Sequence, residues 1–109
     1  MARERIHLFD TTLRDGQQTP GMDFSVEDKL LVMSLLDKLG VDYIEGGFPG
    51  GNPTDTTLFS VPRKSKATFT AFGMTKRAGR SVSNDSGLQQ LLSAHAPAAC
   101  FVAKSWDYH

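Results

Sequence analysis

Apolar side chains recur at helical spacing in one long run of the chain. Within residues 26–39 they fall three or four positions apart, at Val26, Leu30 and Met33 and at Leu31, Leu35 and Leu39. Ser25 is a good N-cap for this run, Asp28 stands three residues further on, and Gly40 supplies a C-terminal stop. This pattern predicts a helix over residues 26–39.

Shorter apolar stretches bounded by polar and turn residues are typical of buried parallel strands. Four such stretches predict strands at residues 6–11, 41–47, 67–73 and 98–105, the second of them ending at Glu45. Residues 6–11 alternate imperfectly, as expected for a strand that is buried on both faces.

Two further helices are expected between these strands. Asn52 would cap the first, with Pro53 at its first position and Asp55 in its first turn. Residues 83–96 predict the second, which places Leu88, Leu91 and Leu92 on one face. Because strands alternate with helices, the sequence predicts a parallel sheet with right-handed crossovers.

Two α/β architectures are compatible with this order of elements. A doubly wound open sheet could close with about this many residues. An eight-stranded TIM (β/α)8 barrel needs roughly 250 residues, so the 109 residues of this chain, with about four βα units, would form its first half.

Charge and composition narrow the range of partners. The chain has 12 basic and 12 acidic side chains and a net charge of +0, so it offers no basic field for nucleic acid or for an anionic membrane. The single cysteine excludes an internal disulfide. Without an apolar segment typical of a signal peptide or a membrane span, the chain is expected to be cytoplasmic.

Polar side chains gather where the predicted strands end. The first strand is followed by Asp10, Arg14, Asp15 and Gln18, the second ends at Glu45, the third is followed by Thr75 and Lys76, and the fourth by Lys104, Ser105 and His109. In both architectures functional residues cluster at the carboxyl ends of strands. Four such groups indicate one shared polar site at one end of the sheet.

Residue type suggests the chemistry of that site. Asp15 is a hard oxygen ligand for a divalent cation, and Arg14 is a permanent charge suited to a carboxylate or a developing oxyanion. Together they would suit a 2-oxo acid, with Glu45 orienting a ligand or water. The alternatives are an Arg14–Asp15 surface ion pair, an exposed strand-end charge at Glu45, and backbone contacts for Gln18 and Ser105.

Other polar residues near the site have simpler interpretations. Asp10 is expected to hold the loop rather than take part in chemistry. Cys100 is expected to be a buried small hydrophobe, because its neighbours are apolar. Lys76, Arg77 and Arg80 form a local basic cluster, which is usually a solvated face, although phosphate groups are a conceivable partner.

The stretch "DTTLRDGQQTPG", residues 10–21, resembles the signature of a family of metal-dependent acyltransferases that includes the 2-isopropylmalate, homocitrate and citramalate synthases. The resemblance continues through "DYIEGGFPGGNPTDT", "FGMTKRAG", "SNDSGLQQLL" and "CFVAKSWDYH", so it covers almost the whole chain. "EGGFPGGNPTD" and "FVAKSWDYH" are most similar to the citramalate-type branch. Isopropylmalate synthases usually carry Glu where this chain has Gln17.

The resemblance implies that residues 1–109 are the incomplete N-terminal part of a pyruvate carboxyltransferase-type barrel. It implies a condensation of acetyl-CoA with pyruvate to (R)-citramalate and CoA, a step toward isoleucine. Asp15 would bind a divalent metal (Mg, Mn or Zn), and Arg14 would stabilise the developing alkoxide. Gln18 and Glu45 would lie in or next to the site, and Ser105 near the 2-oxo acid. The full-length protein is expected to be a homo-oligomer.

The chain departs from this family in its histidines. The family completes its metal site with a His-x-His pair on a later strand, which also carries a catalytic Glu. This chain has His7, His95 and His109 and no His-x-His pair. We therefore expect a fragment that is inactive alone.

Two other functions stay open. One is a 2-isopropylmalate synthase, which takes 2-oxoisovalerate in place of pyruvate. The other is a non-catalytic α/β module that binds a small anion or forms part of a split subunit.

Overall fold

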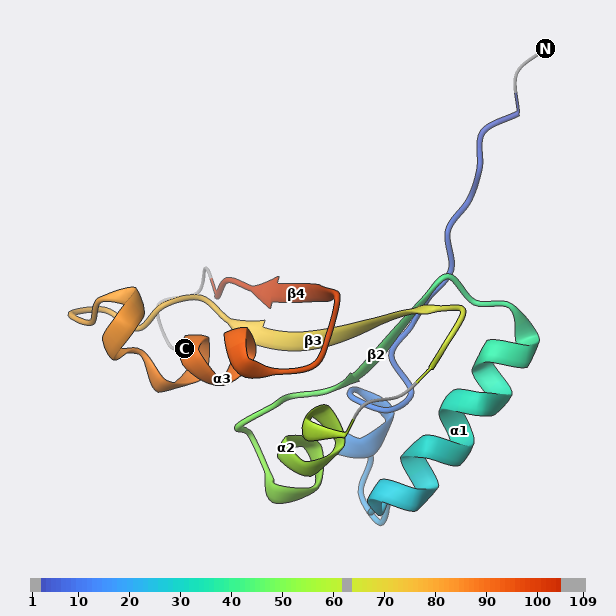
Figure 1. The fold of residues 1–109 in the computed structure, drawn as a ribbon, viewed down its shortest axis with the longest axis horizontal. Helices are drawn as coiled ribbons and strands as arrows, with labels where there is room; N and C mark the ends of the chain where they lie inside the picture. The colour runs from blue at the N-terminus through green and yellow to red at the C-terminus, as the bar shows by residue number, and fades with distance from the viewer. Residues whose placement is uncertain (1–2, 62–63, 105–109) are drawn as a thin grey trace.

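The computed structural model describes residues 3–61 and 64–104 (Figure 1). Its strands and α-helices alternate along the chain, and two short 3-10 helices lie in loops. In chain order the elements are β1 (Phe9–Asp10), η1 (Gly16–Gln18), α1 (Val26–Leu39), β2 (Tyr43–Gly47), α2 (Pro53–Ser60), β3 (Thr68–Met74), η2 (Val82–Asn84), α3 (Ser86–Ser93) and β4 (Ala98–Val102).

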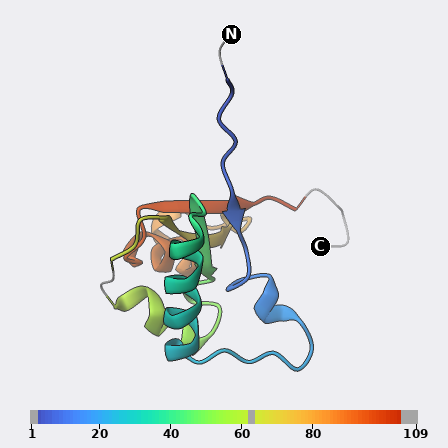
Figure 2. The ribbon, with the colours of Figure 1, turned by 90° about the vertical axis from the view of Figure 1, so that its right-hand side faces the viewer.

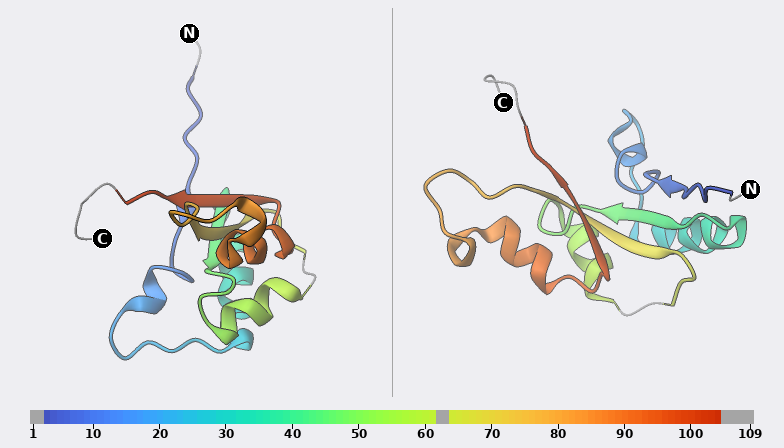
Figure 3. Two further views of the ribbon diagram at one scale, coloured as in Figure 1. Left: turned by 90° about the vertical axis from the view of Figure 1, so that its left-hand side faces the viewer. Right: turned by 90° about the horizontal axis from the view of Figure 1, so that it is seen from above.

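The strands form one parallel sheet in the order β1-β2-β3-β4. Each strand therefore lies next to its neighbour in sequence, and the order never reverses. A doubly wound sheet requires such a reversal, whereas a barrel adds its strands sequentially. Seen from above, the strands fan out with the usual twist of a parallel sheet (Figure 3). The predicted partial α/β barrel is confirmed for the described residues.

The helices α1, α2 and α3 lie on one face of the sheet (Figure 2). The core between helices and sheet is made of apolar side chains, among them Leu13, Met33, Ile44, Leu58, Phe59, Phe69 and Ala71. The opposite face of the sheet is covered by none of the described α-helices (Figures 1 and 2). In a complete barrel this opposite face would line the interior.

The capping residues behave as the sequence predicts. Ser25 and Asp28 form a reciprocal capping box at the start of α1, and Gly40 ends the helix in the left-handed conformation, with φ 92°. Asn52 caps α2 by accepting a hydrogen bond from the backbone N–H of Asp55, and Pro53 is its first residue. The helix predicted over 26–39 is confirmed to the residue.

The predicted burial of apolar side chains near β1 and on α3 is wrong at two places. The first strand was expected over residues 6–11 and buried, but β1 contains Phe9–Asp10 only, and Ile6 is 82% exposed. Within the described chain β1 pairs with β2 on one side alone, so the apolar side chains of this segment stay largely exposed. Leu92 was expected to share an apolar face with Leu88 and Leu91, but it is 72% exposed because α3 turns it away from β3.

Candidate functional site

An arginine and a buried glutamate meet at the carboxyl end of the first two strands. The Nε–H of Arg14 donates a hydrogen bond to Oε1 of Glu45, which is only 1% exposed. The guanidinium carbon of Arg14 lies 4.4 Å from the centroid of the Phe72 ring, so the cation also stacks on an aromatic face. The ion pair is thus covered by protein on its inner side.

Strand alternation places this pair on the face of the sheet that the helices leave uncovered. Ile44 belongs to the core under the helices, so its neighbour Glu45 points the opposite way. Phe69 and Ala71 face the same core, which turns Phe72 toward Glu45. Cys100 pairs with Phe72 in register on β4 and therefore joins the same face.

Cys100 lies close enough to the Arg14–Glu45 pair for both charges to act on its thiol. Burial raises the pKa of the Cys100 thiol, and the charge and hydrogen bond of Glu45 raise it further, while Arg14 opposes the shift. The thiol is therefore kept protonated and neutral beside the carboxylate. The sequence predicted a buried small hydrophobe here, which is wrong about burial, because Cys100 is only partly buried in β4. Its register opposite Phe72 places it at the site, and no local pattern in the sequence specifies that register.

The loop after β1 is closed on itself by backbone and side-chain hydrogen bonds. The carbonyl of Thr11 accepts hydrogen bonds from the backbone N–H groups of Arg14, Asp15 and Gly16, at 3.2, 2.7 and 3.2 Å. Asp10 accepts two hydrogen bonds from Thr12, from the backbone N–H and from the hydroxyl, each at 2.9 Å. Asp10 holds the loop, as expected, and the loop in turn directs Arg14 toward Glu45.

The structure brings together only part of the predicted site. Arg14 and Glu45 are in contact, which replaces the alternatives of an Arg14–Asp15 surface pair and an exposed Glu45. Asp15 and Gln18 are exposed in the same loop, at the start and end of η1, and Asp15 makes no capping hydrogen bond with its side chain. Ser105 lies outside the described residues, so its predicted role stays a prediction.

A neighbouring amide presents a buried acceptor. Oε1 of Gln17 is inaccessible to solvent and has no hydrogen-bond partner among the described residues. A buried carbonyl oxygen of this kind favours a donor from a ligand or from further protein. Gln17 therefore places an unsatisfied polar atom in the loop that also holds Arg14 and Asp15.

The fit to a divalent metal is partial. Asp15 offers one exposed carboxylate next to Arg14. Within residues 3–61 and 64–104, no group of three or more His, Cys, Asp and Glu side chains is placed to hold a metal ion. A metal at this edge of the sheet would need ligands in addition to Asp15.

A buried ion pair behind the site was missed in the sequence. Lys29 of α1 is 0% exposed, and its ammonium donates to Oδ1 of Asp55 on α2 at 2.5 Å. Burial lowers the pKa of Lys29, and the hydrogen bond and charge of Asp55 oppose that shift. One signal was available, because Lys29 lies on the helical face that carries Val26, Leu30 and Met33.

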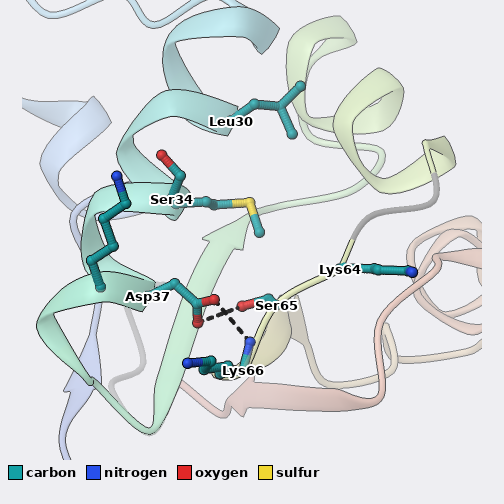
Figure 4. Close-up of a pocket in the computed structure, with 8 residues that line it drawn as sticks. Leu30, Ser34, Asp37, Lys64, Ser65 and Lys66 are labelled. Atoms are coloured by element: carbon teal, nitrogen blue, oxygen red, sulfur yellow. Dashed lines mark hydrogen bonds between the residues drawn. The ribbon is translucent and has the colours of Figure 1, made fainter.

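A hollow also lies at the opposite, amino-terminal end of the sheet, between α1 and the segment before β3 (Figure 4). Here Asp37 accepts hydrogen bonds from the Ser65 hydroxyl and from the backbone N–H groups of Lys66 and Ala67, at 2.9, 2.9 and 2.8 Å. The carboxylate is thus engaged in holding the chain. This end of a barrel serves stability rather than chemistry.

Comparison with known proteins places the chain in a family. The sequence matches the HMGL-like family over residues 5–78. It is 43% identical to an (R)-citramalate synthase of Aquifex aeolicus and 44% identical to one of Streptomyces coelicolor, with 97% of this chain and 21% of each relative covered. A 2-isopropylmalate synthase of Listeria welshimeri is 54% identical over 52 residues, which are 48% of this chain and 10% of that protein.

The chain spans about a fifth of the length of the citramalate synthases it matches. A separate finding is that no helix among the described residues is long and apolar enough to cross a membrane.

The family match covers most of the sequence, includes the loop that holds Arg14, and agrees with the sequential parallel sheet. The chain belongs to the HMGL-like family.

Proposed function

We propose that residues 1–109 form the N-terminal part of the catalytic barrel of an acyltransferase that condenses acetyl-CoA with pyruvate to (R)-citramalate and CoA. The observation that carries the proposal is the Arg14–Glu45 pair at the carboxyl end of the sheet, in a chain similar along 97% of its length to proteins named (R)-citramalate synthase. The substrates are those of the reaction that this name describes.

Arg14 is the residue proposed to act on the substrate. Its bond to Glu45 uses Nε–H, so the two Nη groups at the outer end of the guanidinium can donate to the oxygen that becomes negative during attack on the ketone. Glu45 holds the plane of the guanidinium, and the Phe72 ring limits its tilt. The site thus aims a fixed positive charge at the developing alkoxide.

Asp15 is proposed as the one metal ligand supplied by the described residues. A divalent metal (Mg, Mn or Zn) would supply polarisation of the ketone of the 2-oxo acid when bound. Ser105 is proposed to lie near the 2-oxo acid, and Gln18 is proposed to lie in or next to the site. The further ligands are proposed to come from the remainder of a longer protein, and this segment alone is expected to be inactive.

A second candidate is a 2-isopropylmalate synthase. It is favoured by the 54% identity over 52 residues to the Listeria protein. It would use the same Arg14 and Asp15 with a branched 2-oxo acid. The two candidates differ in the substrate and not in the chemistry.

The test is release of CoA thiol by the intact protein that carries this segment, given acetyl-CoA with either pyruvate or 2-oxoisovalerate. We expect higher kcat/KM with pyruvate, and a preference for the branched acid would replace the citramalate assignment with the second candidate. Arg14→Gln should lower kcat by about 100- to 1000-fold, the usual loss for an oxyanion donor. An Arg14→Gln protein with the parent kcat would remove Arg14 from the chemistry.

A further inference from the structure

The ammonium of Lys29 touches the two backbone segments that carry the Arg14–Glu45 pair. Besides Asp55, its Nζ donates to the carbonyl of Leu13 at 2.7 Å and to the carbonyl of Gly46 at 3.0 Å. Leu13 directly precedes Arg14, and Gly46 directly follows Glu45. One buried cation therefore joins the loop after β1 to the end of β2.

We propose that Lys29, held by Asp55, is a positioning residue that sets the alignment of the Arg14 guanidinium with the Glu45 carboxylate. The inference rests on the proposed function only for its catalytic consequence. All three N–H donors of the ammonium are used, on Leu13, Gly46 and Asp55, so the cation has one preferred placement. The position of the cation in turn fixes the positions of the Leu13 and Gly46 carbonyls.

Asp55 is itself fixed, which is what makes Lys29 an anchor rather than a mobile cation. Its Oδ2 accepts hydrogen bonds from the backbone N–H of Phe48 at 2.9 Å and from the side-chain amide of Asn52 at 3.0 Å. Gly47 leaves room for this carboxylate, because a Cβ there would lie 2.5 Å from Cγ of Asp55. The N-terminus of α2, the end of β2 and α1 therefore meet at one point.

Stability alone does not require a charged pair at this point. Two charges taken out of water carry a desolvation cost, and a well-packed apolar pair of similar volume is often neutral or stabilising by comparison. An apolar pair would leave the carbonyls of Leu13 and Gly46 with no donor between them. The charged arrangement therefore fixes the positions of the backbone next to Arg14 and Glu45, which an apolar arrangement would not do.

The test compares Lys29→Met with a matched control in the intact protein that carries this segment. Leu58→Ala is the control, because Leu58 is buried in the same core on α2 and none of its side-chain atoms belongs to the site. With arginine labelled in ¹⁵N, the Arg14 Nε–H resonance, assigned by its loss in Arg14→Lys, reports the bond to Glu45. We expect a shifted, slowly exchanging signal in the parent and in Leu58→Ala.

In Lys29→Met we expect this signal to move to the position of exposed arginines. We also expect kcat to fall by about 100-fold, the cost of a misplacement near 1 Å, while KM for acetyl-CoA stays near the parent value. The double variant Lys29→Met/Asp55→Leu removes the unpaired buried carboxylate and provides the same readout if the single variant fails to fold.

The outcomes separate this inference from the proposed function. An Arg14 signal that stays unchanged in the variants overturns the positioning role of Lys29, whatever the activity. A lost signal with unchanged kcat supports the positioning role and overturns the catalytic role proposed for Arg14. A lost signal together with a lowered kcat supports both.

Discussion

Carboxylates hold the chain at both ends of the parallel sheet, but the two ends differ in how far these charges are removed from water. At the carboxyl end, Glu45 and Asp55 are buried, and each faces a cation, Arg14 or Lys29. At the amino end, Asp37 and Asp42 stay partly accessible and bind mainly backbone N–H groups. The Arg5 partner of Asp42 is 74% exposed.

This difference separates two uses of a charge. Accessible carboxylates at the amino end accept hydrogen bonds at little desolvation cost, so they fasten turns and strand starts. Buried charges at the carboxyl end are costly to desolvate and lose much if one partner is removed. A fold keeps such pairs where the placement of a group matters, and that end of a barrel is where chemistry takes place.

The largest effect is expected from breaking the buried pair. Asp55→Ala leaves the Lys29 ammonium buried without a counter-charge, so the free energy of unfolding should fall by about 3–5 kcal/mol. Urea unfolding measures this loss. The double variant Lys29→Met/Asp55→Leu should be more stable than the single one. If Asp55→Ala lowered the free energy of unfolding by no more than the loss of an exposed ion pair does, the contrast between the two ends would be wrong.

The close packing behind Glu45 should give the next largest effect. A Cβ at Gly46 would lie 2.1 Å from Cζ of the buried Phe69 ring, so Gly46→Ala should lower the free energy of unfolding by about 1–3 kcal/mol. Gly16→Ala is the matched control, because its Cβ would meet Thr12 Cγ2 at an ordinary 3.6 Å. Equal urea midpoints for the two variants would contradict this expectation.

At the amino end, Asp37→Asn should have a smaller effect. The amide keeps one acceptor but loses the charge, so we expect a loss of about 1 kcal/mol in the free energy of unfolding, as for partly screened hydrogen bonds. Hydrogen bonds from the backbone of Lys66 and Ala67 lower the pKa of Asp37 below its ordinary value of 3.8. The stability that the ionised Asp37 carboxylate contributes is therefore complete above pH 3.8 and disappears as the pH falls through its folded-state pKa.

Urea unfolding at several pH values checks the sign of this contribution. The parent and Asp37→Asn proteins should differ at neutral pH and converge below pH 3.8. A difference that grew in acid would show that the pKa of Asp37 is raised in the folded state.

The smallest effect is expected from Arg5→Gln. Arg5 and Asp42 are 2.7 Å apart, but Arg5 is largely in solvent, and Asp42 keeps the backbone N–H of Leu8. Its small loss of stability should vanish in about 1 M salt, where exposed pairs are screened. A loss that persists in salt, or exceeds that of Asp37→Asn, would make the amino end resemble the carboxyl end.

Local signals predicted the elements well. Ser25, Asp28 and Gly40 marked both ends of α1, and Asn52 with Pro53 marked the start of α2. These signals depend on neighbours within a few residues, so the chain itself contains all the information. The length and burial of β1 were predicted wrongly, because they depend on which strands and helices lie beside it.

The candidate site was predicted by residue type and only partly by arrangement. Placement at strand ends indicated one shared polar site, and the structure brings Arg14 and Glu45 of that group into contact although 31 positions separate them. Strand ends carry no information on which side chains point toward each other across the sheet. The approach of Cys100 to Glu45 required the register of β3 and β4, which no local pattern specifies.

By itself, the sequence determined the helices, their caps, the parallel direction of the strands and the residue types at the carboxyl end of the sheet. Helical periodicity, capping and turn chemistry act over one or two turns, so one sequence is enough to establish them. Only the tertiary structure decided that Lys29 is buried rather than solvated, and that Arg14 is paired with Glu45 rather than with Asp15. Burial and pairing depend on segments that are distant in the chain, and packing alone brings those segments together.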